Sequence, residues 1–477
     1  MDHYNNNGIL GDLWQQKILV STAHFNKDDK TAPVFFYAGN EGAIENFFTN
    51  SGFVTETLAK EFGAAVIFAE HRFFGDSMPG GSVEAAKMPE VYKFLTTEQA
   101  QQDYVNLINY MKNPAKDDIN AVNFQKLDLA KRPIIVVGGS YGGMLAAWLR
   151  MKYPHIFAGA LASSAPLMFS PETVSPYAFN EAITNQYKAQ NLLCPTFIKA
   201  HLLSLAGSMK NGKLYKDISK AYGTCDVIKT KEEMQALIDL TESAFKTMAM
   251  VNYPYPTDLM GEIPANPLAT VCTPFAKLKP KTKVTAIWPL VAKGMKLVYP
   301  NDELRQCFDL ASYMKVDNTQ HTADMFWEVM ACNQFILPQY SNGKTDMFIP
   351  SVNTAASDEK KCMEEWGVKA QPDWILEQYG GKNPEFDYAS FSNIIFTNGS
   401  QDPWKVGGIT KQLWDETTTG LYFMEINNAT HHYDLRNDHP NDPDTVQLVR
   451  GAEITILRTF IDEFNARYTE ETATLVL

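Results

Sequence analysis

The chain of 477 residues contains no apolar run of the roughly 18 residues that are needed to span a bilayer. Its opening, MDHYNNNGIL, also lacks the basic segment and the apolar segment that together make a secretory signal peptide. Either the protein is cytosolic, or the printed sequence starts downstream of a targeting signal. Positive charge is scarce as well, since 42 Lys and Arg face 55 Asp and Glu for a net charge of -13. This balance argues against general binding to nucleic acid or to anionic membranes.

Close cysteine pairs of the C-x-x-C kind, which are typical of zinc sites, are also absent from the sequence. The six cysteines all fall in one part of the chain, and they are Cys194, Cys225, Cys272, Cys307, Cys332 and Cys362. An even number confined to one region favours disulfides over the alternative of buried free thiols. Disulfides in turn indicate an oxidising compartment.

What the sequence does contain is a well-filled core, with 45% apolar residues, and a regular alternation of strand and helix patterns. Between residues 33 and 167, short apolar runs alternate with segments of helical periodicity, which predicts a parallel sheet covered by helices. Strand patterns return at 392–399 and 420–427, and an amphipathic helix follows. Residues 168–385 are rich in helix formers and prolines and show no strand alternation. We therefore predict an α/β domain formed by 1–167 and 386–477, with 168–385 inserted as a mainly helical cap that carries disulfides.

The segment GGSYGG, Gly138–Gly143, follows a predicted strand and precedes a predicted helix. In a G-x-S-x-G turn the serine is held in a strained conformation that projects its hydroxyl, and its neighbours must be small. The pattern makes Ser140 a candidate nucleophile, and the backbone N–H of Tyr141 a candidate oxyanion donor. The alternative is a glycine-rich turn that binds a phosphate or has no ligand at all.

A serine nucleophile needs a histidine base and a carboxylate, in the chain order Ser, Asp, His for this kind of sheet. Asp402 follows the strand pattern at 392–399, and the adjacent His431 and His432 follow the strand pattern at 420–427. Spacing alone leaves open which histidine is the base. Asp434 is close to both, and we expect it to brace the loop. This chemistry requires no metal and no cofactor.

The loop Tyr37–Gly42, YAGNEG, follows the first of these strand patterns and is expected to supply the second oxyanion donor through Gly39 or Asn40. A plain glycine turn is the alternative. Glu41 in the same loop is a candidate for binding a positive group of the substrate. Two glycosylation sequons, at Asn398 and Asn428, adjoin the predicted catalytic residues, so we expect both to be unmodified.

The segments FFYAGNEG, FAEHRFFGDS, GGSYGGMLAAWLRMKYPHIF, NYPYPTDL, TNGSQDPW and HHYDLR resemble the serine peptidase family of lysosomal Pro-Xaa carboxypeptidase and dipeptidyl peptidase II. The resemblance runs through nearly the whole chain. It implies an α/β-hydrolase fold with a helical cap and cleavage of peptides next to proline at acidic pH. The implied triad is Ser140, Asp402 and His431, with His432 as a neighbour.

The resemblance also implies three cap disulfides, which are Cys194–Cys272, Cys225–Cys307 and Cys332–Cys362. It suggests a homodimer located in the lysosome or another secretory compartment, or secreted. In the family the segment MDHYNNN has its counterpart downstream of a signal peptide, so the printed chain looks shortened at its front.

Within this family the resemblance favours a dipeptidyl peptidase that releases N-terminal Xaa-Pro or Xaa-Ala dipeptides. Such an enzyme needs an anion for the substrate ammonium, and Glu41 and Asp346 are the candidates. The aromatic side chains Trp327 and Phe348 could form the proline pocket, unless they belong to the cap core. The alternative activity is a Pro-Xaa carboxypeptidase. More distant alternatives are a lipase or esterase and an inactive hydrolase-fold binding protein.

Overall fold

The computed structural model describes residues 3, 14–115, 121–315 and 319–474. Seven strands form one sheet in the order β1-β3-β2-β4-β5-β6-β7, and every neighbouring pair is parallel except β1 with β3. The strands are β1 (Ile18–Ser21), β2 (Val34–Ala38), β3 (Ala65–Ala69), β4 (Ile134–Gly139), β5 (Gly159–Ser163), β6 (Ile394–Gly399) and β7 (Leu421–Ile426). The predicted α/β-hydrolase fold is confirmed, and six of the seven strands lie within the predicted apolar runs.

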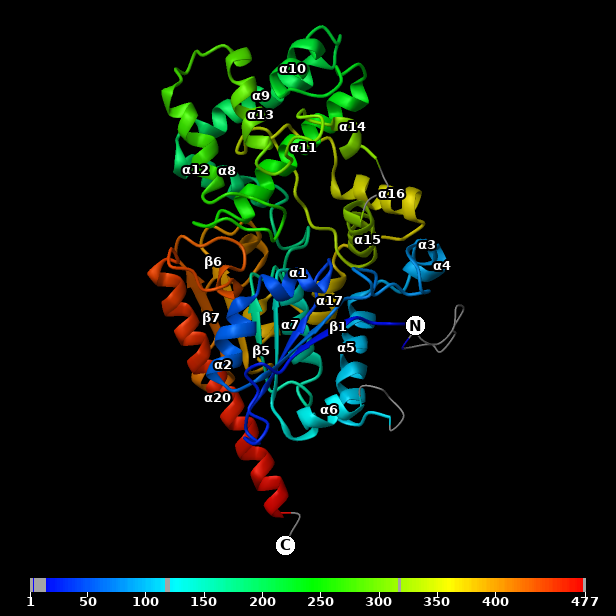
Figure 1. The fold of residues 1–477 in the computed structure, drawn as a ribbon, viewed down its shortest axis with the longest axis vertical. Helices are drawn as coiled ribbons and strands as arrows, with labels where there is room; N and C mark the ends of the chain where they lie inside the picture. The colour runs from blue at the N-terminus through cyan, green and yellow to red at the C-terminus, as the bar shows by residue number, and fades with distance from the viewer. Residues whose placement is uncertain (1–2, 4–13, 116–120, 316–318, 475–477) are drawn as a thin grey trace.

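Strands β2 to β6 are buried along their whole length because helices cover both faces of the sheet. On one face, Phe36 and Val136 pack with α5 (Thr97–Lys112) and α7 (Tyr141–Lys152). On the other face, Phe35 and Ile135 pack with η1 (Phe53–Leu58) and α20 (Asp444–Thr474). Figure 1 shows α20 running along the edge of the sheet next to β7.

Most of the helices between β5 and β6 gather beyond one end of the sheet, as Figure 1 shows, whereas α17 (Trp374–Tyr379) packs beside α7 through the stacked rings of Tyr379 and Trp148. The segment also contains α8 (Ala178–Gln190), α9 (Cys194–Ser208), α10 (Tyr215–Tyr222), α11 (Lys231–Met250), α12 (Pro267–Cys272), η3 (Thr273–Lys277), η4 (Val284–Ala286), α13 (Trp288–Met295), α14 (Leu310–Tyr313), α15 (Thr319–Gln334), α16 (Ala355–Trp366) and α18 (Pro384–Asp387). The three predicted disulfides, Cys194–Cys272, Cys225–Cys307 and Cys332–Cys362, are present and confirm the predicted pairing. The boundaries of the cap at 168 and 385 stay a prediction.

Shorter helices lie in the connections between the strands and between β7 and α20. They are α1 (Ile44–Thr49), α2 (Ala59–Glu61), α3 (Val83–Ala86), α4 (Pro89–Tyr92), α6 (Ala121–Leu127), η2 (Leu129–Lys131), η5 (Pro403–Gly407), α19 (Glu416–Thr419) and η6 (Tyr433–Leu435). The aromatic ring of Trp404 on η5 packs against Phe169 and Phe179 of the inserted segment, with ring centroids 5.5 and 4.7 Å apart. The inserted helices therefore contact the loop that follows the carboxyl end of β6. Within the ranges given above, no helix is both long and apolar enough to cross a membrane.

Candidate active site

Ser140 occupies a strained turn between β4 and α7. Its backbone has φ 57° and ψ -126°, which is a conformation that few residues other than glycine adopt. The turn is tight because Gly138 and Gly142 approach each other, and a Cβ on Gly138 would lie 2.0 Å from the Gly142 carbonyl oxygen. A nucleophile elbow has this shape, and it lifts the serine hydroxyl out of the sheet.

The carboxylate of Asp402 lies next to His431. Asp402 Oδ2 is 2.8 Å from His431 Nδ1, and both side chains are buried. The other oxygen, Asp402 Oδ1, accepts a hydrogen bond of 2.9 Å from the backbone N–H of Trp404, which fixes the carboxylate. With Nδ1 bonded to Asp402, Nε2 is the nitrogen of His431 that can take up a proton from a nucleophile.

The base loop and the serine turn are joined through their neighbouring residues. The Ser140 N–H donates to the Ser163 carbonyl over 2.9 Å, and the His432 N–H donates to the Ser164 hydroxyl over 2.7 Å. The ring of His432 also packs on the residue before Ser140, because a Cβ on Gly139 would lie 2.9 Å from His432 Cγ. The structure therefore brings Ser140, Asp402 and His431 to the same end of the sheet.

His432 has different partners from His431, which separates the two histidines. Its Nδ1 lies 2.9 Å from Arg436 Nη2, and its side chain is buried. Burial holds the pKa of His432 well below the usual value, so this imidazole is neutral. The rings of His431 and His432 are 4.5 Å apart. The geometry favours His431 as the base and His432 as the neighbour that packs behind it.

Asp434 does not reach the base in the way that Asp402 does. Its Oδ1 accepts a hydrogen bond of 2.6 Å from the Ser163 hydroxyl, and the side chain is buried beneath the loop. This arrangement agrees with the expectation that Asp434 braces the loop.

Of the expected oxyanion donors in the loop Tyr37–Gly42, the structure excludes Gly39 and leaves Asn40. The Gly39 N–H donates to the Ala69 carbonyl over 3.0 Å, so it is part of the sheet and is not free to bind an oxyanion. No acceptor among the described residues takes the backbone N–H of Asn40. The Asn40 side chain is fixed, since its Nδ2 donates to the Gly139 carbonyl over 2.6 Å. The N–H of Asn40 and that of Tyr141, at the first position of α7, are the remaining candidates.

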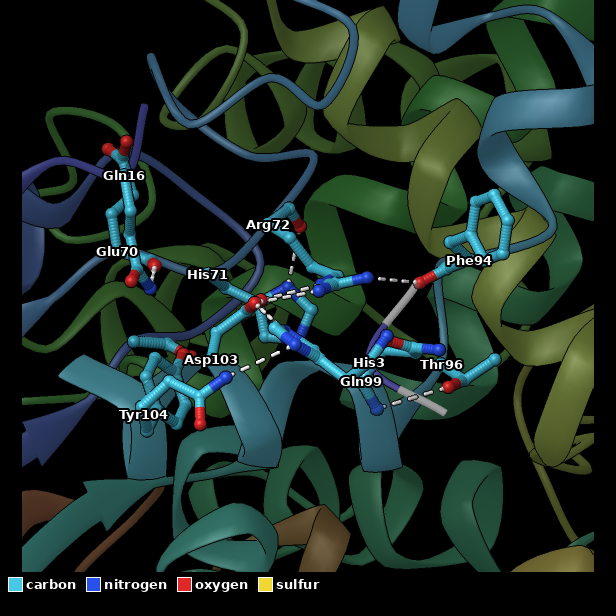
Figure 2. A network of polar contacts seen from close by, with 12 residues as sticks. His3, Gln16, Glu70, His71, Arg72, Phe94, Thr96, Gln99, Asp103 and Tyr104 are labelled. Carbon is cyan, nitrogen blue, oxygen red and sulfur yellow. Dashed lines mark hydrogen bonds and ion pairs between the residues drawn. The ribbon is translucent and has the colours of Figure 1, made fainter. Parts of the chain in front are cut away.

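Tyr141 is held by a buried polar network. Its hydroxyl lies 3.0 Å from His71 Nε2, and burial lowers the pKa of His71 to about 4, so the imidazole is neutral. His71 Nδ1 is 2.7 Å from the Arg72 carbonyl oxygen, and the Arg72 guanidinium pairs with Asp103 at 2.6 and 2.7 Å. Figure 2 shows His71 and this buried Arg72–Asp103 pair. The network gives His71 a local structural role.

Glu41 is an unusual carboxyl group because one of its oxygens has no partner. Oε2 is buried and bonds to no described residue, and burial raises the pKa of Glu41. The charge of His431 partly opposes this rise, which places Glu41 near the base. Burial therefore favours the neutral form of Glu41, whereas our expectation was an ionised anion.

Of the other expected substrate-binding residues, only Trp327 lies near the serine turn. Its ring is 5.6 Å from that of Tyr141. Asp346 accepts hydrogen bonds from the Ser341 hydroxyl and from the backbone N–H groups of Asn342 and Phe348, so its carboxylate braces its own loop. The side chain of Phe348 is buried in the core of the inserted helices, as the alternative interpretation had it.

Sequence reasoning missed the anchor of the base loop. The Tyr253 hydroxyl donates to the His431 carbonyl over 2.7 Å, and the His431 N–H donates to the Met250 carbonyl over 3.2 Å. Both partners come from the inserted segment, and no periodicity could have shown a contact over 178 positions. The tyrosine-rich motif NYPYPTDL was the available signal.

Of the two glycosylation sequons, that of Asn398 is buried. The Asn398 Nδ2 donates to the Ile409 carbonyl over 2.6 Å, which leaves no room for a glycan there.

Comparison with known proteins gives consistent matches. Residues 1–453 match the family model described as serine carboxypeptidase S28. Lysosomal Pro-X carboxypeptidase from Bos taurus is 32% identical over 98% of this chain and 87% of its own length, and the protein of that name from Homo sapiens is 32% identical over 97% and 87%. The thymus-specific serine protease of Homo sapiens is 24% identical over 94% of this chain and 81% of its own length.

Proposed function

The chain belongs to the serine carboxypeptidase S28 family and is a serine peptidase, and we propose that it removes the C-terminal residue from peptides whose penultimate residue is proline. The bond between His431 Nδ1 and Asp402 Oδ2, beside the strained Ser140, carries the catalytic part of the proposal. The mammalian relatives named Pro-X carboxypeptidase, which match 97–98% of this chain, support the choice of substrate end.

In the proposed mechanism, His431 Nε2 takes the proton from the Ser140 hydroxyl while Ser140 Oγ attacks the proline carbonyl carbon. The oxyanion is held by the N–H groups of Asn40 and Tyr141. The protonated His431 then gives its proton to the amine of the leaving amino acid. Water hydrolyses the acyl-enzyme by the same steps, and Asp402 stabilises the imidazolium each time it forms.

The resemblance first favoured the release of N-terminal dipeptides, and one observation still supports that second candidate. The unpaired oxygen of Glu41 would suit a substrate ammonium if Glu41 were ionised. Burial raises the pKa of Glu41, however, which favours the neutral form, and a neutral group does not repel a substrate carboxylate. The neutral form of Glu41 therefore supports the carboxypeptidase activity.

Matched peptides separate these two activities. We expect the purified protein at acidic pH to release phenylalanine from an amino-blocked peptide that ends in Pro-Phe. The same peptide with an amidated C-terminus tests whether the free carboxylate is needed, and chromogenic Gly-Pro and Lys-Ala dipeptides test the other candidate. Turnover of the chromogenic dipeptides without release of phenylalanine would replace our proposal by the dipeptidyl activity.

We further propose that the protein works on peptides, as a homodimer, in the lysosome or another secretory compartment, or outside the cell. The names of the relatives and the three disulfides support such a compartment. Analytical ultracentrifugation of the purified protein tests the dimer, and fractionation of cells that express the natural gene tests the compartment.

A further inference from the structure

Two buried carboxyl groups, those of Asp434 and Glu453, lie behind the catalytic residues and take part in none of the steps above. The residues are 1% and 0% exposed. Asp434 belongs to η6, which begins two residues after His431, and Glu453 lies on α20. A carboxyl group in such a place is costly unless it is bonded or neutral, so both need a physical explanation.

One hydroxyl on a central strand holds each group. Ser163 on β5 donates to Asp434 Oδ1 over 2.6 Å, and Thr397 on β6 donates to Glu453 Oε1 over 2.6 Å. Ser163 and Thr397 are paired in the register of the two parallel strands. Their side chains therefore leave the same face of the sheet about 5 Å apart. The two carboxyl groups are therefore held on the same face of the sheet by neighbouring strands.

The second oxygen of each group lacks a partner. Asp434 Oδ2 and Glu453 Oε2 are both buried and accept no hydrogen bond from the part of the chain that the structure describes. Two ionised carboxylates offer only acceptors and repel each other, whereas a single proton between them would satisfy both oxygens. In agreement, burial raises the pKa of both groups, and the charge of Asp434 raises the pKa of Glu453 further.

The charged groups around the pair do not replace that proton. Arg450 lowers both pKa values through its charge, but its five hydrogen bonds go to the carbonyls of Tyr433, Asp434 and Arg436 and to the carboxylates of Asp438 and Asp442. A guanidinium has five N–H donors, so none is left for either carboxyl group. Arg436 acts on Asp434 through its charge and bonds to His432, while its Nε and Nη1 are buried and donate to no described residue, Asp434 and Glu453 included. The charge of Asp434 also reaches Tyr253.

The strand end that anchors Asp434 also holds the catalytic turn. The Ser163 carbonyl accepts the N–H of Ser140 over 2.9 Å, and the Ser164 hydroxyl accepts the N–H of His432 over 2.7 Å. A movement of Asp434 away from Ser163 would therefore change the positions of both Ser140 and the loop that carries His431.

We propose that Asp434 and Glu453 share one proton and act as a positioning pair, which holds the loop 431–434 against the ends of β5 and β6 only while the proton is present. When the proton leaves, two negative charges occupy one buried site, and their repulsion loosens the loop that carries His431. The pair thereby limits the enzyme to acidic conditions through its structure. Only the activity readout of this inference rests on the proposed function.

The direction of the pH dependence follows from the raised pKa values. The folded state binds the shared proton more tightly than the unfolded chain does, so the stabilisation is complete below the ordinary carboxyl pKa of about 4. It is lost as the pH rises through the raised pKa of the pair. The wild-type protein should therefore melt at a lower temperature at neutral pH than at acidic pH.

The test compares the wild-type protein with Glu453→Gln and Asp434→Asn. Either amide can keep its hydroxyl contact and offer a permanent N–H to the partner carboxylate. Asp462→Asn removes an exposed carboxyl group from the same helix and is the matched control. We expect the fall in melting temperature with pH to be smaller in the two amide variants and unchanged in the control. In the amide variants, the ratio of kcat/KM at neutral pH to kcat/KM at acidic pH should be about tenfold higher than in the wild-type protein. The reason is that loss of one proton lowers the protonated fraction tenfold for each pH unit above the pKa.

Infrared spectroscopy reports the shared proton directly. The difference spectrum between the wild-type protein and Glu453→Gln should show the C=O stretch of a protonated carboxyl at a pH where exposed carboxyls are ionised. The subtraction removes the bands of other buried carboxyls such as Glu41. Absence of this band from the difference spectrum would overturn the proposal, as would an unchanged pH dependence of melting in both amide variants. If one variant fails to fold, the other and the infrared band decide. Lack of peptidase activity at every pH would count against the proposed function, while melting and infrared would still test the pair.

Discussion

His431 and Asp402 are 29 positions apart in the chain, yet His431 Nδ1 lies 2.8 Å from Asp402 Oδ2 in a buried contact. The two residues follow β7 and β6, which are neighbouring parallel strands, so the contact is a product of the sheet order. Because the contact occupies Nδ1, Nε2 is the nitrogen that remains to take up the serine proton. His432 has Arg436 in place of a carboxylate and cannot be oriented in this way.

Substitution of the two histidines should therefore give very different results. We expect His431→Ala to lower kcat by about 10⁴-fold or more, because the serine loses its base. His432→Ala removes the packing behind the turn and the contact with Arg436, for which a loss of about 100-fold is the upper range. Steady-state kinetics on the Pro-Phe peptide measure both. The reverse order of the two losses would show that the base has been misassigned.

Asp402→Asn tests the orienting role of the carboxylate. The amide can still occupy the site, but it favours the wrong tautomer of His431 and cannot stabilise the imidazolium. A fall in kcat of about 10⁴-fold with a small change in KM is expected. Asp434→Asn at acidic pH serves as the comparison, since Asp434 contacts Ser163 and not the base. Equal losses in the two variants would contradict the assignment of Asp402.

Glu41→Gln tests the charge state of the carboxyl group beside the triad. Burial raises the pKa of Glu41, so its neutral form persists to a higher pH than that of an exposed carboxyl, and its negative charge appears as the pH rises further. That charge would repel a substrate carboxylate, so KM for the Pro-Phe peptide should increase with pH in the wild-type protein and much less in the variant. Glu45→Gln, which alters a more exposed carboxylate paired with Lys17, is the control. A large loss of activity on dipeptides with a free ammonium in Glu41→Gln would instead favour the dipeptidyl activity.

The disulfide Cys332–Cys362 should matter for both stability and substrate binding. It closes a loop with a sequence separation of 30, and its removal by a double Cys→Ser substitution should cost about 3 kcal/mol of unfolding free energy. Cys332 lies on α15 with Trp327, whose ring packs on Tyr141, so KM should rise as well. The matched variant without Cys225–Cys307 should lose stability with KM unchanged. Urea unfolding and kinetics measure the two effects, and an unchanged KM in both variants would exclude Trp327 from the substrate site.

Much of the fold could be predicted because buried parallel strands appear in the sequence as continuous apolar runs. The strands β2 to β6 have this form, and the turn residues Gly138 and Gly142 mark the elbow. The strand β1 was missed because it is a half-exposed edge strand of four residues, and its short pattern does not stand out.

The sequence shows which residues follow a predicted strand, but it does not show which hydrogen bonds their backbone and side chains form. The order of Ser140, Asp402 and His431 after their strands predicted a triad, and the structure brings these residues to the same end of the sheet. The Gly39 N–H was expected to bind an oxyanion, but its bond to Ala69 depends on strand register, which the sequence does not show. In the same way, the partners of Asp346 and the burial of Glu41 arise from tertiary packing.

Labelling of the purified protein with a fluorophosphonate, followed by peptide mapping, tests the central claim most directly. An activated serine beside an oxyanion site should attack the reagent, so the account predicts one adduct on the peptide that contains Ser140 and none in Ser140→Ala. A folded wild-type protein that stays unlabelled at its pH of maximal stability, or that carries the adduct on another residue, would contradict it.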